Sequence, residues 1–186
     1  MGAGAERIRA LESGADAGAD ITAATASLSS ATGIGGGGTI EIDLTTLTSA
    51  AVSGTGAIDL SDTAGGLAVT SATTNNGAIT LAASGVDSVL AVTTATAGAG
   101  GNILLRADEI NLGAANTLIG TGTLVLVPEA VAQNIEIGAA DNVTVGELDI
   151  TTADITAIKD GFSSITIGNV TSGTGTVNVS NAATFT

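Results

Sequence analysis

Hydrophobic residues alternate with polar or small residues in short runs along most of this chain. In each run an Ile, Leu or Val stands two residues before another, and Gly, Asn, Ser, Thr or Asp closes the run. Apolar residues at positions i and i+2 are typical of a β-strand with one buried face. The chain is therefore predicted to be all-β, built from one short unit used many times. The clearest runs are residues 39–42, 57–60, 78–81, 102–105, 123–126, 134–137, 164–167 and 176–179.

The spacing of the runs predicts how they are arranged. Ile58, Ile79, Ile103 and Leu124 follow one another at intervals of 21, 24 and 21 residues. A second set of runs, at residues 67–69, 90–92 and 110–112, keeps nearly the same period with intervals of 23 and 20 residues. Two inward-facing strands in each turn of about twenty residues, joined by tight turns, predict a parallel β-helix (β-solenoid) around a continuous aliphatic column.

The alternation also predicts which side chains point into this column. We expect Asp59, Thr80, Leu104 and Val125 to point outward, with Leu104 and Val125 forming an apolar contact strip for a neighbouring molecule. The inward set is Ile58, Leu60, Ile79, Leu81, Ile103, Leu105, Leu124 and Leu126.

The amino-acid composition fits a narrow solenoid core. Aromatic residues make up 1% of the chain, and the two that occur are Phe162 and Phe185. Stacked Ile, Val, Leu and Ala fill such a core, which has little room for rings. The 27 glycines suit tight turns, and the one proline, Pro128, interrupts few of the hydrogen bonds between turns. The length is typical of a single domain.

The pattern divides the chain into two parts. Residues 1–38 are expected to form an irregular or short helical segment, either an N-terminal cap or an irregular first turn, in which residues 6–11 have a helical spacing. Residues 39–186 are expected to form the solenoid, which is regular to about residue 127. An insertion is expected near residues 147–161, with a helix from Thr152 that stops at Gly161.

Charge narrows the choice of partners and location. Eighteen acidic and four basic residues give a net charge of −14, which argues against binding to nucleic acid or to anionic lipid. Membrane insertion is not expected either, because no stretch of eighteen apolar residues occurs. The first residues do not resemble a secretory signal, so we expect any export signal to lie elsewhere.

Residues 100–186 resemble a segment of very large bacterial exoproteins. The resemblance is carried by residues 101–112, 122–128, 134–138 and 153–168, which alternate Asn-Ile and Ile-Asn-Leu runs. These proteins are the filamentous-haemagglutinin-like adhesins. The resemblance implies a right-handed β-helix that serves as a stalk, adhesin or matrix fibre at the cell surface or outside the cell. It brings no catalytic motif with it.

Few residues suggest chemistry. The absence of His and Cys removes the usual nucleophilic triads and the commonest metal ligand. Three acidic pairs occur: Asp16 with Asp20, Asp59 with Asp62, and Asp108 with Glu109. Because the aromatic platforms and basic groups expected in a carbohydrate-cleaving site are scarce, we interpret these pairs as a solvated face and expect no catalytic or cofactor-binding residues. Calcium stays open as a ligand, because hard oxygen donors are abundant, although no known calcium-loop spacing is present.

Together these observations predict a structural or adhesive segment of an extracellular fibrous protein rather than an enzyme. The strand pattern near the carboxyl end predicts an open edge through which copies associate end to end. Surface polysaccharide or other matrix proteins are further expected partners. The alternative is a carbohydrate-active β-helix enzyme or a polysaccharide-binding module. An ice-binding face is not expected, because the threonine pairs at residues 46/48, 121/123 and 174/176 do not share one place in the repeat.

Overall fold

The structure is a computed structural model that describes residues 18–138, 140, 146–181 and 184. Short strands dominate this part of the chain, and the one helix described is short. The elements are β1 (Ile21–Ser30), β2 (Ile40–Val52), β3 (Ile58–Asp62), β4 (Leu67–Val69), β5 (Ala72–Thr74), β6 (Ile79–Ala83), β7 (Val89–Val92), β8 (Ala95–Ala97), β9 (Ile103–Ala107), β10 (Glu109–Leu112), β11 (Leu118–Ile119), β12 (Thr123–Pro128), β13 (Asn134–Ile137), β14 (Glu147–Ile150), α1 (Thr152–Ala157), β15 (Ser164–Ile167) and β16 (Val177–Val179).

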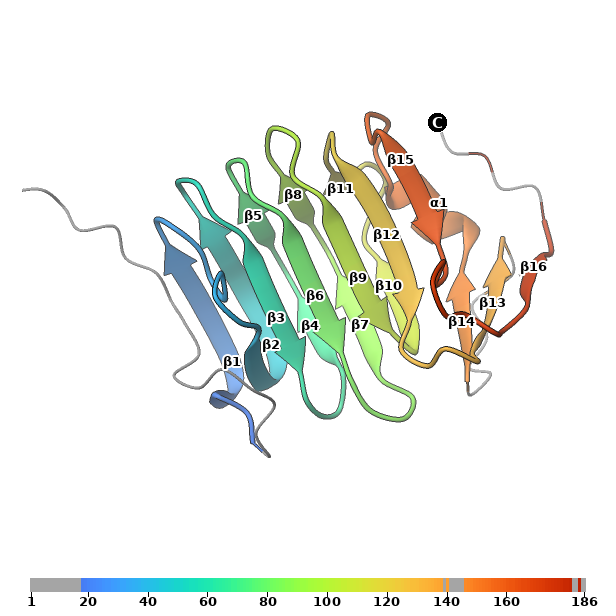
Figure 1. The fold of residues 1–186 in the computed structure, drawn as a ribbon, viewed down its shortest axis with the longest axis horizontal. Helices are drawn as coiled ribbons and strands as arrows, with labels where there is room; N and C mark the ends of the chain where they lie inside the picture. Colours follow the sequence, from blue (N-terminus) through green and yellow to red (C-terminus); the bar gives the residue numbers. More distant parts are fainter. Residues whose placement is uncertain (1–17, 139, 141–145, 182–183, 185–186) are drawn as a thin grey trace, which may run out of the picture.

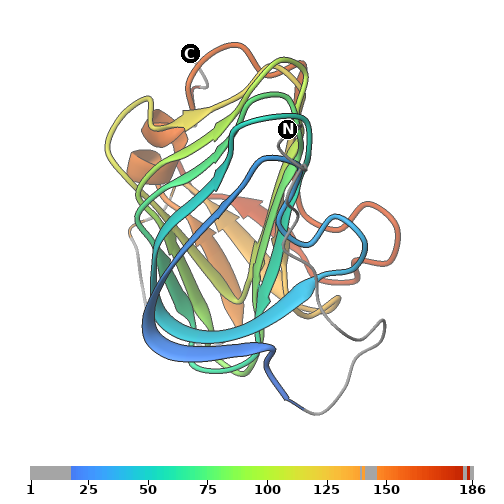
Figure 2. The ribbon, with the colours of Figure 1, turned by 90° about the vertical axis from the view of Figure 1, so that its left-hand side faces the viewer.

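The strands stack in parallel into a β-solenoid, as the sequence predicted. One strip of the wall, the front strip, consists of β3, β6, β9, β12 and β15, and another, the back strip, contains β4, β7 and β10. In Figure 1 the front strands run downward, the back strands run upward and the chain advances from left to right, so the coil is right-handed. Viewed along the rod, the turns overlie one another around a single core (Figure 2).

The register between turns confirms the predicted period. Ile58 pairs with Ile79, Ile79 with Ile103 and Ile103 with Leu124, which reproduces the intervals of 21, 24 and 21 residues. In the back strip Leu67 pairs with Leu90 and Leu90 with Ile110. Like side chains therefore lie over like side chains, and the core is a set of aliphatic rows that run along the rod.

The predicted inward and outward positions are confirmed in the front strip. All eight residues predicted to point inward are fully buried. Asp59, Thr80, Leu104 and Val125 lie on the outer surface and are partly exposed. Burying each aliphatic side chain contributes about 1.5–3 kcal/mol, so the rows are the main source of stability.

Each regular turn has three strands, and the prediction of two was wrong. The third strip consists of β5, β8 and β11, which follow β4, β7 and β10 after a corner of two or more residues. One inward row of this strip consists of Ala72, Ala95 and Leu118, and Ala50 of β2 precedes them in it. The strip escaped detection because alanine fills most of the inward positions, so the large–small alternation that marks the other strands is weak there.

The solenoid begins before residue 39, where the sequence predicted an irregular first turn. The ten residues of β1 form a continuous strand that pairs with β2 from Ile21–Ile42 to Ser30–Val52. Ile34 bridges to Ile58, yet Ile40 pairs with Leu60, so the intervening residues contain a short excursion from the wall. Gly35 is required there, since its φ is +84° and an added Cβ would lie 2.3 Å from the carbonyl oxygen of Asp59. The helical turn expected at residues 6–11 lies outside the described residues.

The last turn departs from the regular order. β14 lies between β10 and β13, although β13 precedes β14 in the sequence, and β16 pairs with the other edge of β13. The sequence predicted the insertion at residues 147–161, but β14 and α1 take the places of an ordinary turn beside β10 and β11. Ile158, directly after α1, bridges to Leu118 of β11. The additional strand is therefore β13, and the expectation that residues 147–161 form the insertion was wrong.

The helix expected from Thr152 is present but is shorter than predicted. It ends at Ala157, and Thr151 and Asp154 form a capping box at its start. Asp154 also accepts a hydrogen bond from the main-chain N–H of Leu112, at 2.7 Å, so the same carboxylate holds the helix against the preceding turn.

Replacing Ile79 by Asp should therefore unfold the solenoid at neutral pH, because it places an unpaired charge in the aliphatic row. Thr80→Asp is the matched control, since it puts the same charge one residue away on the outer surface and should cost less than about 1 kcal/mol. Urea denaturation followed by far-ultraviolet circular dichroism measures both. Similar losses of stability for the two variants would contradict the register.

Candidate functional site

Acidic side chains gather where the chain passes from the front strip to the back strip. Asp62 ends β3, Asp87 shortly precedes β7, Asp108 and Glu109 lie at the junction of β9 and β10, and Glu129 follows β12. We call these five residues the acidic corner. The sequence between consecutive corners holds few charges, so the period of the solenoid repeats the acids along one edge of the rod.

Carboxylates of this corner accept hydrogen bonds from main-chain N–H groups of neighbouring turns. The N–H of Leu44 donates to Oδ1 of Asp62 at 3.1 Å, and the N–H of Asp87 donates to Oδ2 of Asp108 at 2.9 Å. An unsatisfied buried N–H costs about 1–3 kcal/mol. These acids therefore stabilise the corners, where the regular ladder is interrupted.

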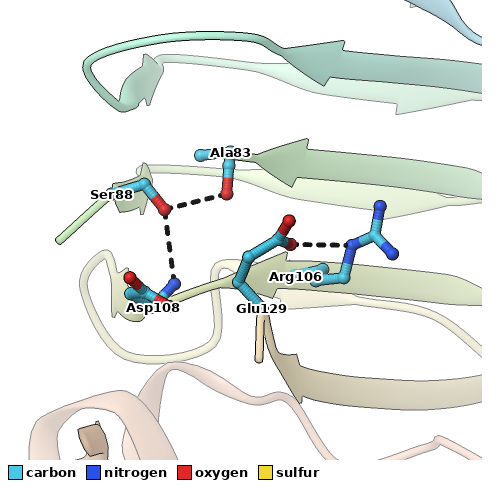
Figure 3. A network of polar contacts seen from close by, with 5 residues as sticks. All are labelled: Ala83, Ser88, Arg106, Asp108 and Glu129. Atoms are coloured by element: carbon cyan, nitrogen blue, oxygen red, sulfur yellow. Dashed lines mark hydrogen bonds and ion pairs between the residues drawn. The ribbon is translucent and has the colours of Figure 1, made fainter. Parts of the chain in front are cut away.

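Ser88 links two turns in the same way (Figure 3). Its hydroxyl donates to the carbonyl oxygen of Ala83 at 2.9 Å and accepts from the N–H of Asp108 at 3.4 Å. Beside it, Nε of Arg106 lies 3.2 Å from Oε2 of Glu129, again joining successive turns. Because this ion pair is partly exposed to solvent, it contributes at most about 1 kcal/mol.

The acidic pairs singled out in the sequence do not form paired sites. Asp59 points outward and accepts a hydrogen bond from the hydroxyl of Thr39, whereas Asp62 points inward and is 0% exposed. Asp108 accepts from Asp87, and its neighbour Glu109 accepts from the N–H of Asp149 at 3.4 Å. Asp16 lies outside the described residues.

Asp20, the other member of the first pair, accepts a hydrogen bond from the N–H of Glu41 at 3.0 Å. It therefore plays the same part as the acids of the corner. In each of the three pairs, the carboxylates that the structure describes accept a hydrogen bond from a residue of a neighbouring turn or strand.

Burial changes the acidity of two of these groups. It raises the pKa of Asp62, although the main-chain hydrogen bond from Leu44 opposes the shift. Burial likewise raises the pKa of Asp59, against the hydrogen bond from Thr39 and the positive charge of Arg106. In both cases the low-dielectric surroundings outweigh the groups that stabilise the anion.

A second acidic group, partly buried, forms on the outward-facing side of β13 and β14. Carboxylate oxygens of Glu136, Glu147 and Asp149 lie within 4.8 Å of one another, and Asp149 is 1% exposed. Burial, together with the negative charges of Glu136 and Asp149, raises the pKa of Glu147. Hard oxygen donors in this arrangement are the type of ligand that calcium prefers.

The sequence analysis missed this group for a physical reason. Glu136 and Asp149 are thirteen residues apart, and they become neighbours only because β14 pairs directly with β13. The regular period of about twenty residues would never place them side by side. The alternation Asn-Ile-Glu-Ile and Glu-Leu-Asp-Ile was the available signal, because it repeats one strand pattern at a non-solenoid distance.

Hydroxyl side chains form in-phase rows that the sequence analysis also missed. Thr73 pairs with Thr96 on the outer surface of the third strip, and Ser29 and Ala51 precede them in the same row. A second row contains Thr94 and Thr117. Main-chain hydrogen bonds align this row, because the N–H of Ala72 donates to the carbonyl oxygen of Thr94 and the N–H of Ala95 donates to that of Thr117. The threonine pairs at residues 46/48, 121/123 and 174/176 lie outside this strip. Their lack of a common place in the repeat therefore says nothing about the hydroxyl rows of the third strip.

A cavity opens between the front and back strips near the carboxyl end of the described solenoid. Its volume is about 190 Å³. Pro128 and Ile167 line the front side, and Ile135 and Val177 line the back side. The lining is mainly aliphatic and backbone, so the cavity is an unfilled end of the core.

Comparison of the chain with protein-family models, with curated proteins and with solved structures gave no match. In the described part of the chain, no helix has the length and hydrophobicity needed to cross a membrane.

Removing the charge of Asp62 should stabilise the protein at neutral pH. Because burial raises its pKa above the ordinary 3.8, the stability contributed by protonated Asp62 is complete below that value and is lost as pH rises through the folded-state pKa. Asp62→Asn keeps an acceptor for Leu44 but carries no charge. We expect a higher melting temperature than wild type at pH 7 and a shrinking difference as pH approaches about 4.

Asp62→Ala is the matched control, since it removes both the charge and the acceptor. It should lose about 1–3 kcal/mol of stability because the Leu44 N–H is left without its partner. If Asp62→Asn is as destabilised as Asp62→Ala at pH 7, the charged carboxylate is favourable and burial does not raise the pKa of Asp62.

The expectation of calcium can be tested at Glu136, Glu147 and Asp149. It predicts that calcium raises the melting temperature more than sodium chloride at equal ionic strength, and that chelation reverses the gain. Glu147→Gln should remove the calcium-specific part while leaving the general effect of salt. Equal effects of the two salts on wild type would show that the net charge is only being screened.

Proposed function

We propose that this chain is a structural and adhesive segment of an extracellular or cell-surface fibrous protein, of the kind that filamentous-haemagglutinin-like exoproteins represent. The observation that carries the proposal is the state of the final strand. Val177 and Val179 of β16 stand in register with Ile135 and Ile137 of β13, in rows that continue the core. They are nevertheless 57% and 60% exposed.

Because Val177 and Val179 continue a core row but are exposed, a further strand would be favourable at the outer edge of β16. The N–H of Ser180 donates to the carbonyl oxygen of Ile137, and Ile135 donates to Thr176. Because N–H groups alternate in direction along a strand, those of Val177 and Val179 point away from β13. A strand placed there would gain main-chain hydrogen bonds and cover two valines, which supports association of copies end to end.

The side of the rod offers a second contact surface. Leu104 and Val125 are register partners on the outside of the front strip, and the hydroxyl rows run along the third strip. A repetitive wall of aliphatic and hydroxyl side chains suits lateral packing or contact with a neutral surface polysaccharide. Projection, linking and adhesion are therefore the actions that we assign to the rod.

A carbohydrate-active enzyme is the competing proposal, favoured by one feature only. Glycoside hydrolysis uses a pair of carboxyl groups, commonly about 5–9 Å apart and one of them with a raised pKa. Carboxylate oxygens of Glu136, Glu147 and Asp149 lie within 4.8 Å of one another, slightly closer than this range, and Glu147 has the raised pKa. Release of reducing sugars from acidic or neutral polysaccharides, abolished by Glu147→Gln, would favour the enzyme over the structural segment.

The end-to-end contact should be sensitive to changes at β16. We expect wild type to form concentration-dependent oligomers in sedimentation velocity, and Val177→Lys with Val179→Pro to sediment as a monomer. The lysine places a charge in the exposed core row, and the proline removes an N–H from the free edge.

Thr80→Lys is the control for the added charge, because Thr80 lies on the outer surface in the middle of the rod. It should associate like wild type, and circular dichroism should show that all three proteins are folded. A monomeric wild type at the highest attainable concentration would refute the end-to-end contact.

A further inference from the structure

The back of the last turn contains one strand more than the front. In the front strip β12 follows β9 directly and β15 follows β12 directly. Behind them, the order from β10 onward is β14, β13 and β16. Figure 1 shows the consequence, because the lower back strands spread beyond the end of the front strip. β14 therefore acts as a wedge between β10 and β13.

β13 is itself suited to the place that β14 occupies. The chain that leads to it already stands on the preceding turn, because the N–H of Glu129 donates to Ala107 at 3.1 Å and Nε2 of Gln133 donates to the carbonyl oxygen of Asp108 at 2.7 Å. The first contact continues the register in which Pro128 pairs with Ala107, whereas the side-chain contact puts Gln133 beside Asp108, four residues out of that register. If β13 continued on β10 from the position of Gln133, Ile135 would lie on Ile110 and Ile137 on Leu112, so its aliphatic residues would be in phase with the core row of β10.

The contact between β10 and β14 is made differently from the other contacts between turns. The ladder of the large sheet ends at β10, and β14 begins a separate three-stranded sheet among the described strands. Side chains join the two instead: Glu109 accepts from the N–H of Asp149, and Asp154 accepts from the N–H of Leu112. β10 and β14 therefore belong to different sheets, whereas the strands of the preceding turns belong to one.

The forces at this contact oppose one another. Inserting β14 buries Leu148 and Ile150 completely. It also brings the carboxylates of Glu109, Glu136, Glu147 and Asp149 onto three adjoining strands, β10, β13 and β14, where like charges repel. Withdrawing β14 would expose its two aliphatic side chains, but it would let β13 form a main-chain ladder with β10 and would separate the acids.

Three observations point the same way: the strand order, the alternation of β13 that can match β10, and the division of β10 and β14 between two sheets. We propose that β13 and β14 exchange places on β10. In the observed order β14 lies between β10 and β13, and the cavity at the end of the core lies between Pro128 and Val177. In the exchanged order β13 pairs with β10, β14 leaves the core, and the back of the rod loses its additional strand. The last turn then closes toward the front strip, so the exchange sets the inclination of the end that β16 presents. The exchange is a property of the single chain and does not depend on the proposed function.

Disulfide trapping distinguishes the two orders, and the chain contains no cysteine that could interfere. Neighbouring strands lie about 4.8 Å apart, whereas strands separated by a third lie about 10 Å apart, beyond the roughly 7 Å that a disulfide spans. Glu136→Cys with Asp149→Cys reports the observed order, in which these residues are register partners. Asn111→Cys with Glu136→Cys reports the exchanged order. Ala91→Cys with Asn111→Cys is the matched control, since these residues are partners in both orders.

After mild oxidation of the full chain, peptide mass spectrometry should find an intramolecular disulfide in all three double variants. Adding Leu148→Asp, which makes burial of β14 unfavourable, should raise the yield of the Asn111→Cys/Glu136→Cys disulfide while circular dichroism keeps its β signal. The proposal is wrong if that disulfide does not form while the other two pairs are trapped. Unfolding of the chain by Leu148→Asp would also overturn it, because β14 would then be indispensable.

Discussion

Every turn of this solenoid depends on its neighbours for main-chain hydrogen bonds. A short parallel strand has no partner within its own turn, so its N–H and C=O groups are satisfied only when the next turn lies in register with it. The aliphatic rows set that register, because a slip of one residue would turn Ile79 and Leu81 outward and Thr80 inward. Hydrogen bonding and burial therefore reinforce each other along the rod, and the outer surface is left free to vary.

The high negative charge is compatible with this architecture partly because several acids lie where the ladder is interrupted. At a corner the main chain changes direction, and its N–H groups need acceptors that the neighbouring strand cannot supply. Asp62 and Asp108 supply them, and Asp154 does so where the helix replaces a strand. A carboxylate is a strong acceptor for an N–H group, but its burial is costly, which is why the pKa of Asp62 rises.

At the carboxyl end of the described solenoid, the burial of aliphatic residues and the separation of the acids are no longer both satisfied. The order β10, β14, β13 and β16 adds a strand to the back of the wall, fills part of the core and leaves Val177 and Val179 uncovered. It also crowds Glu136, Glu147 and Asp149 at one place. The irregular strand order and the exposed valines of β16 therefore lie at the same end of the described solenoid.

The sequence by itself determined the repetitive part of this protein. The intervals between Ile58, Ile79, Ile103 and Leu124 were enough to predict parallel stacking and the facing of the side chains in the front strip, because both follow from local alternation and a constant turn length. The third strip was weaker in sequence, since alanines such as Ala72 and Ala95 carry little hydrophobic contrast. What only the tertiary structure decided was the strand order at the carboxyl end. Asn-Ile-Glu-Ile of β13 and Glu-Leu-Asp-Ile of β14 have the same local pattern, and the choice of which one packs on β10 is made by contacts between residues far apart in the chain.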